Sequence, residues 1–164
     1  MLTGTIPEEL HNLTHLTNLS LSNNAITGIA PTALSGLTGI TVLNLSFNQL
    51  TTIDANTFAD LSNLSQLYLG DNSISTLSPA AFSGLTGLQY FYLQNNSIAT
   101  LDPTIFSGLT SLSYLDISNN HLTALAAGTF TSIGHAMDPW SLTIGGNCIT
   151  GGIDADEITW ANAH

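Results

Sequence analysis

Four tyrosines are spaced so that a repeating chain would bring them together. Tyr68 and Tyr92 are 24 residues apart, as are Tyr90 and Tyr114, and Asp116 follows Tyr92 by the same interval. A tyrosine ring has a large apolar face and a polar hydroxyl, and it loses little conformational entropy on binding, which suits recognition of a protein or a glycan. Aromatic residues also favour the surface of a β-sheet and support one another across strands. The sequence alone favours neither explanation.

Catalytic motifs are scarce. His135 and Asp138 are near each other in sequence, but no nucleophile elbow or paired-carboxylate motif accompanies them. The glycine-rich segment 144–152 resembles neither a dinucleotide fingerprint nor a phosphate-binding loop, so we interpret its glycines as turn residues. We therefore expect a protein that is not an enzyme and that uses no cofactor.

One acidic cluster contains oxygen ligands of the kind that calcium prefers. It consists of Asp154, Asp156 and Glu157. The cluster lacks the glycine and the distal glutamate of an EF-hand loop, so a solvated acidic turn is the favoured interpretation and we expect no metal.

Five Asn-X-Ser/Thr sequons are candidate glycosylation sites in a secreted protein. Asn12 and Asn63 lie at expected turns and are the better candidates. Asn18, Asn44 and Asn95 lie in or beside expected strands, where the local repeat itself generates the motif.

The composition excludes several classes of partner. The chain has 164 residues and is 43% hydrophobic, which supports one domain with a sizeable core. It carries 11 acidic residues and no Lys or Arg, so nucleic acid and anionic membrane surfaces are not expected partners. No apolar run is long enough for a membrane span, and Met1 is not followed by a signal-peptide pattern. Cys148 is the single cysteine, which leaves an inert thiol or a link to another molecule.

A repeat organises the whole chain and would position these residues. Six asparagines recur every 24 residues, except that the last interval is 27 and its extra residues fall near 134–140. Each repeat combines an alternating apolar segment, typical of a strand, with a segment whose apolar residues are three apart, typical of a short helix or 3₁₀ turn. The asparagine amide can both donate and accept, so we predict a structural ladder inside the stack, formed by Asn24, Asn48, Asn72, Asn96, Asn120 and Asn147.

Segments such as LSQLYLGDNSI (64–74) and LQYFYLQNNSI (88–98) follow the pattern L-x-x-L-x-L-x-x-N-x-L, which resembles leucine-rich repeats. FADLSNL and FSGLTGL resemble the 24-residue extracellular type, and the opening LTGTIPEELHNLTHL resembles the plant type. The resemblance implies an α/β-type solenoid with a concave parallel β-sheet and short helical, 3₁₀ or irregular convex segments. Residues 1–164 would form a single domain of about six strand-bearing repeats, with partial, uncapped repeats at both ends.

The same resemblance places the x positions of the strand motif on the concave face. All four tyrosines would then converge on adjacent strands, with Asp71 and Asp116 close by, while Phe91 would point into the core. These six concave-face residues are the predicted binding surface: Tyr68, Tyr90, Tyr92, Tyr114, Asp71 and Asp116.

Function follows from the resemblance only in outline. We expect an extracellular or cell-surface interaction or structural module that binds a protein or glycan ligand through its concave face. Uncapped ends, the lone Cys148 and a surface rich in Ser, Thr and Asn also favour self-association into a multimer, fibre or filament. The alternative is an ice- or surface-binding protein with a Thr/Ser face, although the Thr columns are interrupted. No nucleic acid partner and no membrane insertion are expected.

Overall fold

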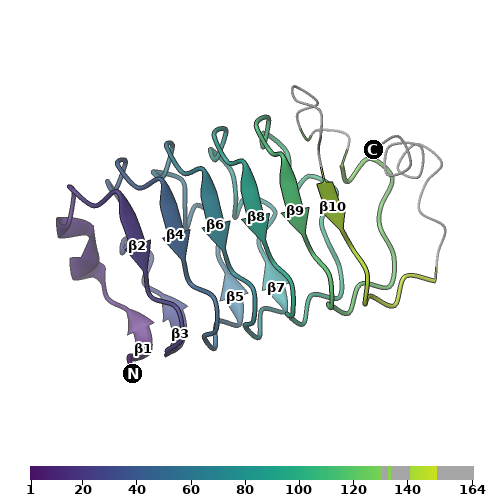
Figure 1. The fold of residues 1–164 in the computed structure, drawn as a ribbon, viewed down its shortest axis with the longest axis horizontal. Coiled ribbons are helices and arrows are strands. Elements are labelled where there is room, and N and C mark those ends of the chain that lie inside the picture. The colour runs from purple at the N-terminus through teal and green to yellow at the C-terminus, as the bar shows by residue number, and fades with distance from the viewer. Residues whose placement is uncertain (131–132, 134–140, 151–164) are drawn as a thin grey trace.

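A six-stranded parallel sheet runs along the molecule (Figure 1). The computed structural model describes residues 1–130, 133 and 141–150. Neighbouring strands pair in register at intervals of one repeat, so that Gln66 aligns with Tyr90 and Tyr90 with Tyr114. The predicted solenoid with a parallel sheet is confirmed. In spatial order the strands are β2 (Asn18–Ser20), β4 (Val42–Asn44), β6 (Gln66–Tyr68), β8 (Tyr90–Tyr92), β9 (Tyr114–Asp116) and β10 (Ser141–Thr143).

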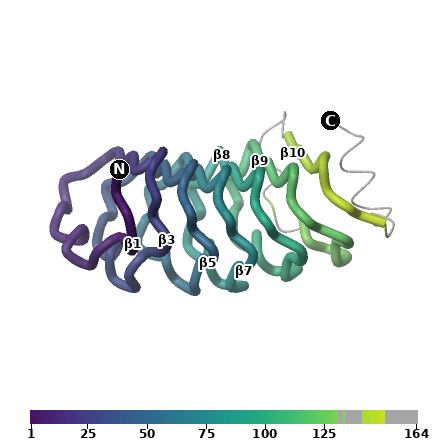
Figure 2. The backbone as a smooth tube through the Cα atoms, turned by 90° about the horizontal axis from the view of Figure 1, so that it is seen from below, coloured from purple at the N-terminus to yellow at the C-terminus, as the bar shows by residue number. Residues whose placement is uncertain are grey.

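The return segments, by which we mean the part of each repeat that leads from one strand of the six-stranded sheet to the next, contain less regular structure. Two short parallel pairs occur there: β1 (Thr3–Ile6) with β3 (Ala25–Ile29), and β5 (Thr52–Ile53) with β7 (Thr76–Leu77). The part of the chain that the structure describes has one 3₁₀ helix, η1 (Glu8–Asn12), and turns at the corresponding places in later repeats. Figure 2 shows the successive coils stacked side by side along the long axis.

The core lies between the sheet and the return segments. Leucines at the inward positions of the inner strands are fully buried, as are phenylalanines from the return segments, whereas Leu19 of β2 and Leu142 of β10 are partly buried. Phe91 of β8 connects these two sets, because its ring meets Phe82 edge to face at 4.6 Å and Phe106 at 6.4 Å between centroids. Burial of each such side chain stabilises the stack by roughly 1.5–3 kcal/mol, and most of this burial is supplied by the neighbouring coil.

Buried and half-buried asparagines connect each coil to the next. Asn96 Nδ2 donates to the carbonyl of Leu93 in its own repeat (3.0 Å) and to that of Leu69 one repeat earlier (3.1 Å). Asn96 Oδ1 accepts from the N–H of Ile74 (2.9 Å). At Asn147 the corresponding sequence separations are longer by three residues, so both cross-repeat bonds of the ladder are kept across the insertion. Cross-repeat donor bonds of this kind are made by Asn48, Asn72, Asn96, Asn120 and Asn147, and Asn24 Oδ1 accepts from Leu2 N–H.

Each of these asparagines is preceded by a residue in the left-handed backbone region. The φ angles there lie between +52° and +73°. Asparagine, aspartate and glycine tolerate this conformation, and five of the six positions hold one of them. Phe47 is the exception, with φ +56° and a side chain that is 54% exposed. The six residues are Asn23, Phe47, Asp71, Asn95, Asn119 and Gly146.

Candidate functional site

The four tyrosines lie on three adjacent strands of the parallel sheet and form what we call the tyrosine face: Tyr68, Tyr90, Tyr92 and Tyr114. The rings of Tyr68 and Tyr92 are stacked, with centroids 4.7 Å apart and planes within 6°. The rings of Tyr92 and Tyr114 are 5.0 Å apart but tilted by 38°. Tyr92 therefore occupies the middle of a continuous aromatic row.

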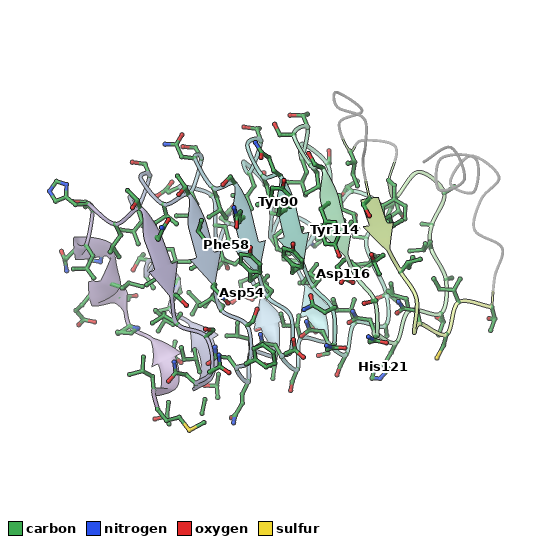
Figure 3. The ribbon with its side chains drawn as sticks, viewed as in Figure 1. Asp54, Phe58, Tyr90, Tyr114, Asp116 and His121 are labelled. Carbon is green, nitrogen blue, oxygen red and sulfur yellow. The ribbon has the colours of Figure 1, made fainter. Side chains whose placement is uncertain are left out.

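Strand register explains this arrangement. Tyr68 and Tyr92 are direct neighbours in one column, and Tyr90 and Tyr114 are direct neighbours in the adjacent column. Residues two apart on a strand share a face, so both columns project from the same side of the sheet. Figure 3 shows Tyr90 and Tyr114 side by side on β8 and β9.

Accessibility differs among the four rings. Tyr90 is 41% exposed, whereas the other three are half-buried by their neighbours. The Tyr68 hydroxyl donates to Gln66 Oε1 at 2.7 Å, which fixes the ring that ends the aromatic row. The sequence did not indicate this bond, because it joins two residues on the same strand through long side chains.

The packing also affects protonation. Burial of the Tyr92 ring raises the pKa of its hydroxyl, and the surrounding Tyr68, Tyr114, Tyr90 and Asp116 add to the rise in that order. The neutral hydroxyl is therefore retained well into the alkaline range, and it can donate or accept a hydrogen bond at neutral pH.

Asp116 continues the column that contains Tyr68 and Tyr92. It is half-buried at the end of β9, and its backbone pairs with Tyr92. Its Oδ1 accepts hydrogen bonds from the backbone N–H of Ser118 (2.9 Å) and from the Ser118 hydroxyl (2.6 Å). Asn44, in the same column, makes the equivalent bond to the Ser46 N–H at 3.0 Å. The carboxylate is thus held in a fixed position beside the aromatic row.

Asp71 is placed differently. It lies in the left-handed turn after β6 and not on the strand. Its carboxylate accepts from Asn95 Nδ2 at 2.8 Å and from Gln94 Nε2 at 3.5 Å. Gln94 extends back over Gly70, whose missing side chain leaves room for it. Asp71 therefore forms a polar cluster with Gln94 and Asn95 in the turns that follow β6 and β8.

The sequon asparagines are distributed over several surfaces. Asn12 and Asn63 are exposed, and their amides donate to the carbonyls of Glu9 (3.1 Å) and Thr38 (2.8 Å). Asn18 is exposed and accepts from the Thr41 hydroxyl, whereas Asn44 is half-buried in β4. Asn95 is exposed and bonded to Asp71, as described above. Their modification stays a prediction.

The structure describes only some of the other candidate sites that the sequence contains. Among the described residues, no three His, Cys, Asp or Glu side chains are grouped as metal ligands would be. Within the same residues no helix has the length and apolar character needed to cross a membrane. Cys148 is exposed and unpaired with another cysteine. The residues His135 and Asp138 and the acidic cluster Asp154, Asp156 and Glu157 lie outside the described part of the chain.

Comparisons with known proteins find the same kind of repeat and the same fold. The leucine rich repeat family model matches residues 3–50, 14–74, 39–98 and 87–135. A search of curated proteins by sequence gives no match. One similar solved structure is titled as a complex of TLR13 with ssRNA13, with 30% identity, a TM-score of 0.79, and coverage of 90% of this chain and 20% of that chain. Another is an octameric complex of Latrophilin 3, Unc5D and FLRT2 (LRR), also with 30% identity and a TM-score of 0.79, covering 95% of this chain and 46% of that chain. The chain thus spans less than half the length of these two relatives.

Proposed function

Because the chain belongs to the leucine-rich-repeat family, we propose that it is a non-enzymatic recognition module that binds a protein through the tyrosine face. The family fold is typical of protein-interaction modules. The similar FLRT2 chain occurs in a complex with two other proteins, Latrophilin 3 and Unc5D. An extracellular or cell-surface location is part of this proposal, because the repeats resemble the 24-residue extracellular type.

The aromatic row carries the proposal. Tyr68, Tyr92 and Tyr114 form a continuous stack, and Tyr90 beside it is 41% exposed. Rings already fixed by one another lose little further freedom when a partner covers them, so more of the contact energy contributes to affinity. A protein surface with apolar side chains and hydrogen-bonding groups would use the exposed ring of Tyr90 and the hydroxyls of the row.

We do not propose that this chain binds RNA, although the similar TLR13 structure is a complex with ssRNA13. Affinity for nucleic acid depends on Lys and Arg side chains that neutralise phosphates, and this chain has neither. Its 11 acidic residues would instead repel a polyanion.

A selection experiment tests the proposal. The purified chain is presented to a displayed library of random peptides and, separately, to a glycan array. Ligands that bind the wild type are then measured with Tyr92→Ala and Tyr114→Ala. The matched control is Thr76→Ala, a change of an exposed residue on β7, in a different sheet. Circular dichroism confirms that each variant is folded.

The proposal expects selected peptides that bind at least about tenfold more weakly to both tyrosine variants and equally well to Thr76→Ala. Peptides that bind all variants equally would contradict it. Recognition of glycans alone, with the same dependence on the tyrosines, would replace the protein partner by a carbohydrate.

Self-association is a second candidate. Among the described strands β2 pairs only with β4, so its other edge presents backbone groups to which a second copy could add a strand. Sedimentation velocity at increasing concentration tests this candidate: growth to dimers or filaments supports it, and a monomer at every concentration contradicts it.

Ice or mineral-surface binding is the remaining alternative. An exposed column of small residues follows the asparagine ladder at an offset of three residues, but Ala99 interrupts its hydroxyl groups. Thermal hysteresis tests this alternative, and its absence would contradict ice binding. The column consists of Thr27, Thr51, Ser75, Ala99, Thr123 and Thr150.

A further inference from the structure

Phe47 has a backbone conformation that is unfavourable for phenylalanine. Its φ angle is +56°, and the other five residues at this position of the repeat are asparagine, aspartate or glycine. A bulky side chain in the left-handed region is strained. Hydrogen bonds on both sides hold the turn in place, because the Phe47 N–H donates to the carbonyl of Gly70 at 3.2 Å and the Phe47 carbonyl accepts from the N–H of Asn24 at 3.1 Å. The phenylalanine therefore lowers the stability of a turn that an asparagine would suit better.

The Phe47 ring also contributes little to the packing of the fold. It is 54% exposed, and it belongs neither to the buried core nor to the partly buried side chains packed against that core. Within the described part of the chain, none of the pairs of packed aromatic rings includes it. A single exposed apolar residue needs no explanation, but backbone strain at the same residue is typical of sites that contact a ligand. Phe47 is thus better suited to contact with another molecule than to the stability of this one.

The turn that contains Phe47 is adjacent to the end of the aromatic row. Asn44, the last residue of β4, pairs with Tyr68, which ends the row. Phe47 follows three residues after Asn44, and its N–H reaches Gly70, which follows Tyr68 by two residues. Neighbouring strands are about 4.8 Å apart, so β4 and β9 are separated by about 14 Å, and an extended segment of about five residues spans that distance.

Charge indicates what kind of segment would lie there. Asp71 occupies the position of Phe47 in the next coil. Its carboxylate accepts from the amides of Gln94 and Asn95, and the chain has no Lys or Arg that could neutralise it. This carboxylate and the net charge of −11 would attract a lysine or arginine of a partner and repel its acidic residues. An apolar side chain would cover the exposed ring and remove apolar surface from water.

We infer that Phe47 is a second contact point for the protein partner, and that it receives an apolar side chain of an extended basic segment. A lysine or arginine of the same segment lies beside Asp71, and the segment continues across β6 and β8 onto the tyrosine face. This inference rests on the proposed function. It extends the binding surface to the turn after β4 and adds the chemical class of the bound segment.

Three defined peptides test the chemistry of the segment. One decapeptide alternates lysine with leucine, one alternates lysine with serine, and one alternates glutamate with leucine. Their affinities for the wild-type chain are measured by fluorescence polarisation. The lysine–leucine peptide is expected to bind about tenfold more tightly than the lysine–serine peptide, and the glutamate–leucine peptide is expected not to bind. Equal affinity for the lysine–leucine peptide and either of the others would overturn the inference.

Phe47→Asn locates the apolar contact. Asparagine tolerates this φ angle, so the variant should be at least as stable as the wild type, yet it should bind the lysine–leucine peptide about tenfold more weakly and the lysine–serine peptide equally well. The matched control is Leu13→Asn, which removes a 51% exposed apolar side chain at the end of η1 and should leave both affinities unchanged. An unchanged affinity in Phe47→Asn would overturn the inference. A loss of both stability and affinity would show that the ring supports the turn, and would overturn it as well.

Two variants of equal charge locate the basic contact. Asp71→Asn should lower the affinity for the lysine–leucine peptide about fivefold. It should fold normally, because asparagine occupies the equivalent turn position at Asn23, Asn95 and Asn119. Asp54→Asn removes the same charge directly after β5, in a different sheet, and should leave the affinity unchanged (Figure 3). Equal losses in both variants would show attraction by net charge alone and would overturn the inference.

Peptides selected from the random library separate this inference from the proposed function. If they require Tyr92 and Tyr114 but bind Phe47→Asn as tightly as the wild type, the proposed function stands and this inference is wrong. If no ligand requires the tyrosines, both are wrong.

Discussion

The side-chain amide of Asn96 donates to the carbonyl of Leu69, which lies 27 residues earlier in the preceding coil, at 3.1 Å. Asn96 is only 6% exposed, so water cannot readily replace this bond. The same amide serves Leu93 and Gln94, and its oxygen accepts from Ile74. One side chain thus satisfies backbone groups in two adjacent coils, which is the physical reason for an asparagine in every repeat.

Replacing Asn96 with leucine should strongly destabilise the fold. The substitution keeps a similar size but leaves several buried backbone groups without partners, at a cost on the order of 3 kcal/mol or more in the free energy of unfolding. Urea denaturation followed by circular dichroism measures the effect. The control is Asn12→Leu, an exposed change in η1 that should alter stability by no more than about 0.5 kcal/mol. Equal midpoints for the two variants would contradict the ladder.

Replacing Phe47 with asparagine should stabilise the chain. A bulky residue at φ +56° is strained, and asparagine relieves that strain while removing an exposed apolar ring. The expected gain is about 1 kcal/mol in the free energy of unfolding. The reciprocal change, Asn23→Phe, places phenylalanine at φ +58° and should cost a similar amount. A loss of stability in Phe47→Asn would mean that the Phe47 ring makes a stabilising contact.

The tyrosine face should make stability sensitive to alkaline pH. The pKa of Tyr92 is raised in the folded state, so above the ordinary tyrosine pKa of about 10 the unfolded chain loses the proton first. The contribution of Tyr92 is therefore fully present below that pH and declines as the pH rises toward the folded pKa. Ultraviolet titration should show one late-ionising tyrosine that is absent from Tyr92→Phe. An unchanged titration in this variant would contradict the assignment.

Asp102 should make stability sensitive to acidic pH. Its Oδ1 accepts from the Thr104 hydroxyl at 2.5 Å and from the Thr104 N–H at 2.8 Å, and these bonds lower the pKa of the carboxyl. The stabilising contribution is present above the ordinary aspartate pKa and is lost as the pH falls through the folded pKa.

Thr104→Val removes only the hydroxyl bond, so the pKa of Asp102 should move back toward its ordinary value. Carbon-detected NMR titration of the carboxyl measures this pKa. The wild-type chain, titrated under the same conditions, is the reference. A pKa of Asp102 that does not change would assign the effect to the backbone donor alone.

The repeat made most of the fold predictable. Leucine and phenylalanine positions repeat every 24 residues because each coil must bury the same side against its neighbour, and the parallel sheet follows from that register. The same 24-residue spacing also predicted that the tyrosines lie on adjacent strands. The longer last interval, between Asn120 and Asn147, was also visible, and the ladder bonds at Asn147 continue across it.

Other details depend on side-chain geometry, which the spacing of residues in the sequence does not determine. The left-handed turns were not predicted, although a column of Asn, Asp and Gly residues could have indicated them. Asp71 shares that column, which places its carboxylate with Asn95 and not within the aromatic row. The tilt of Tyr114 and the Tyr68–Gln66 bond depend on rotamers chosen by packing among long side chains.

The asparagine bonds reach only from one coil to the next, and this range has a mechanical consequence. Among the residues that the structure describes, no asparagine bond spans several coils, so tension applied at the two ends would open the terminal coil first and then its neighbour in turn. Each release would lengthen the chain by about one repeat, and a force–extension trace would take the form of a series of similar small steps.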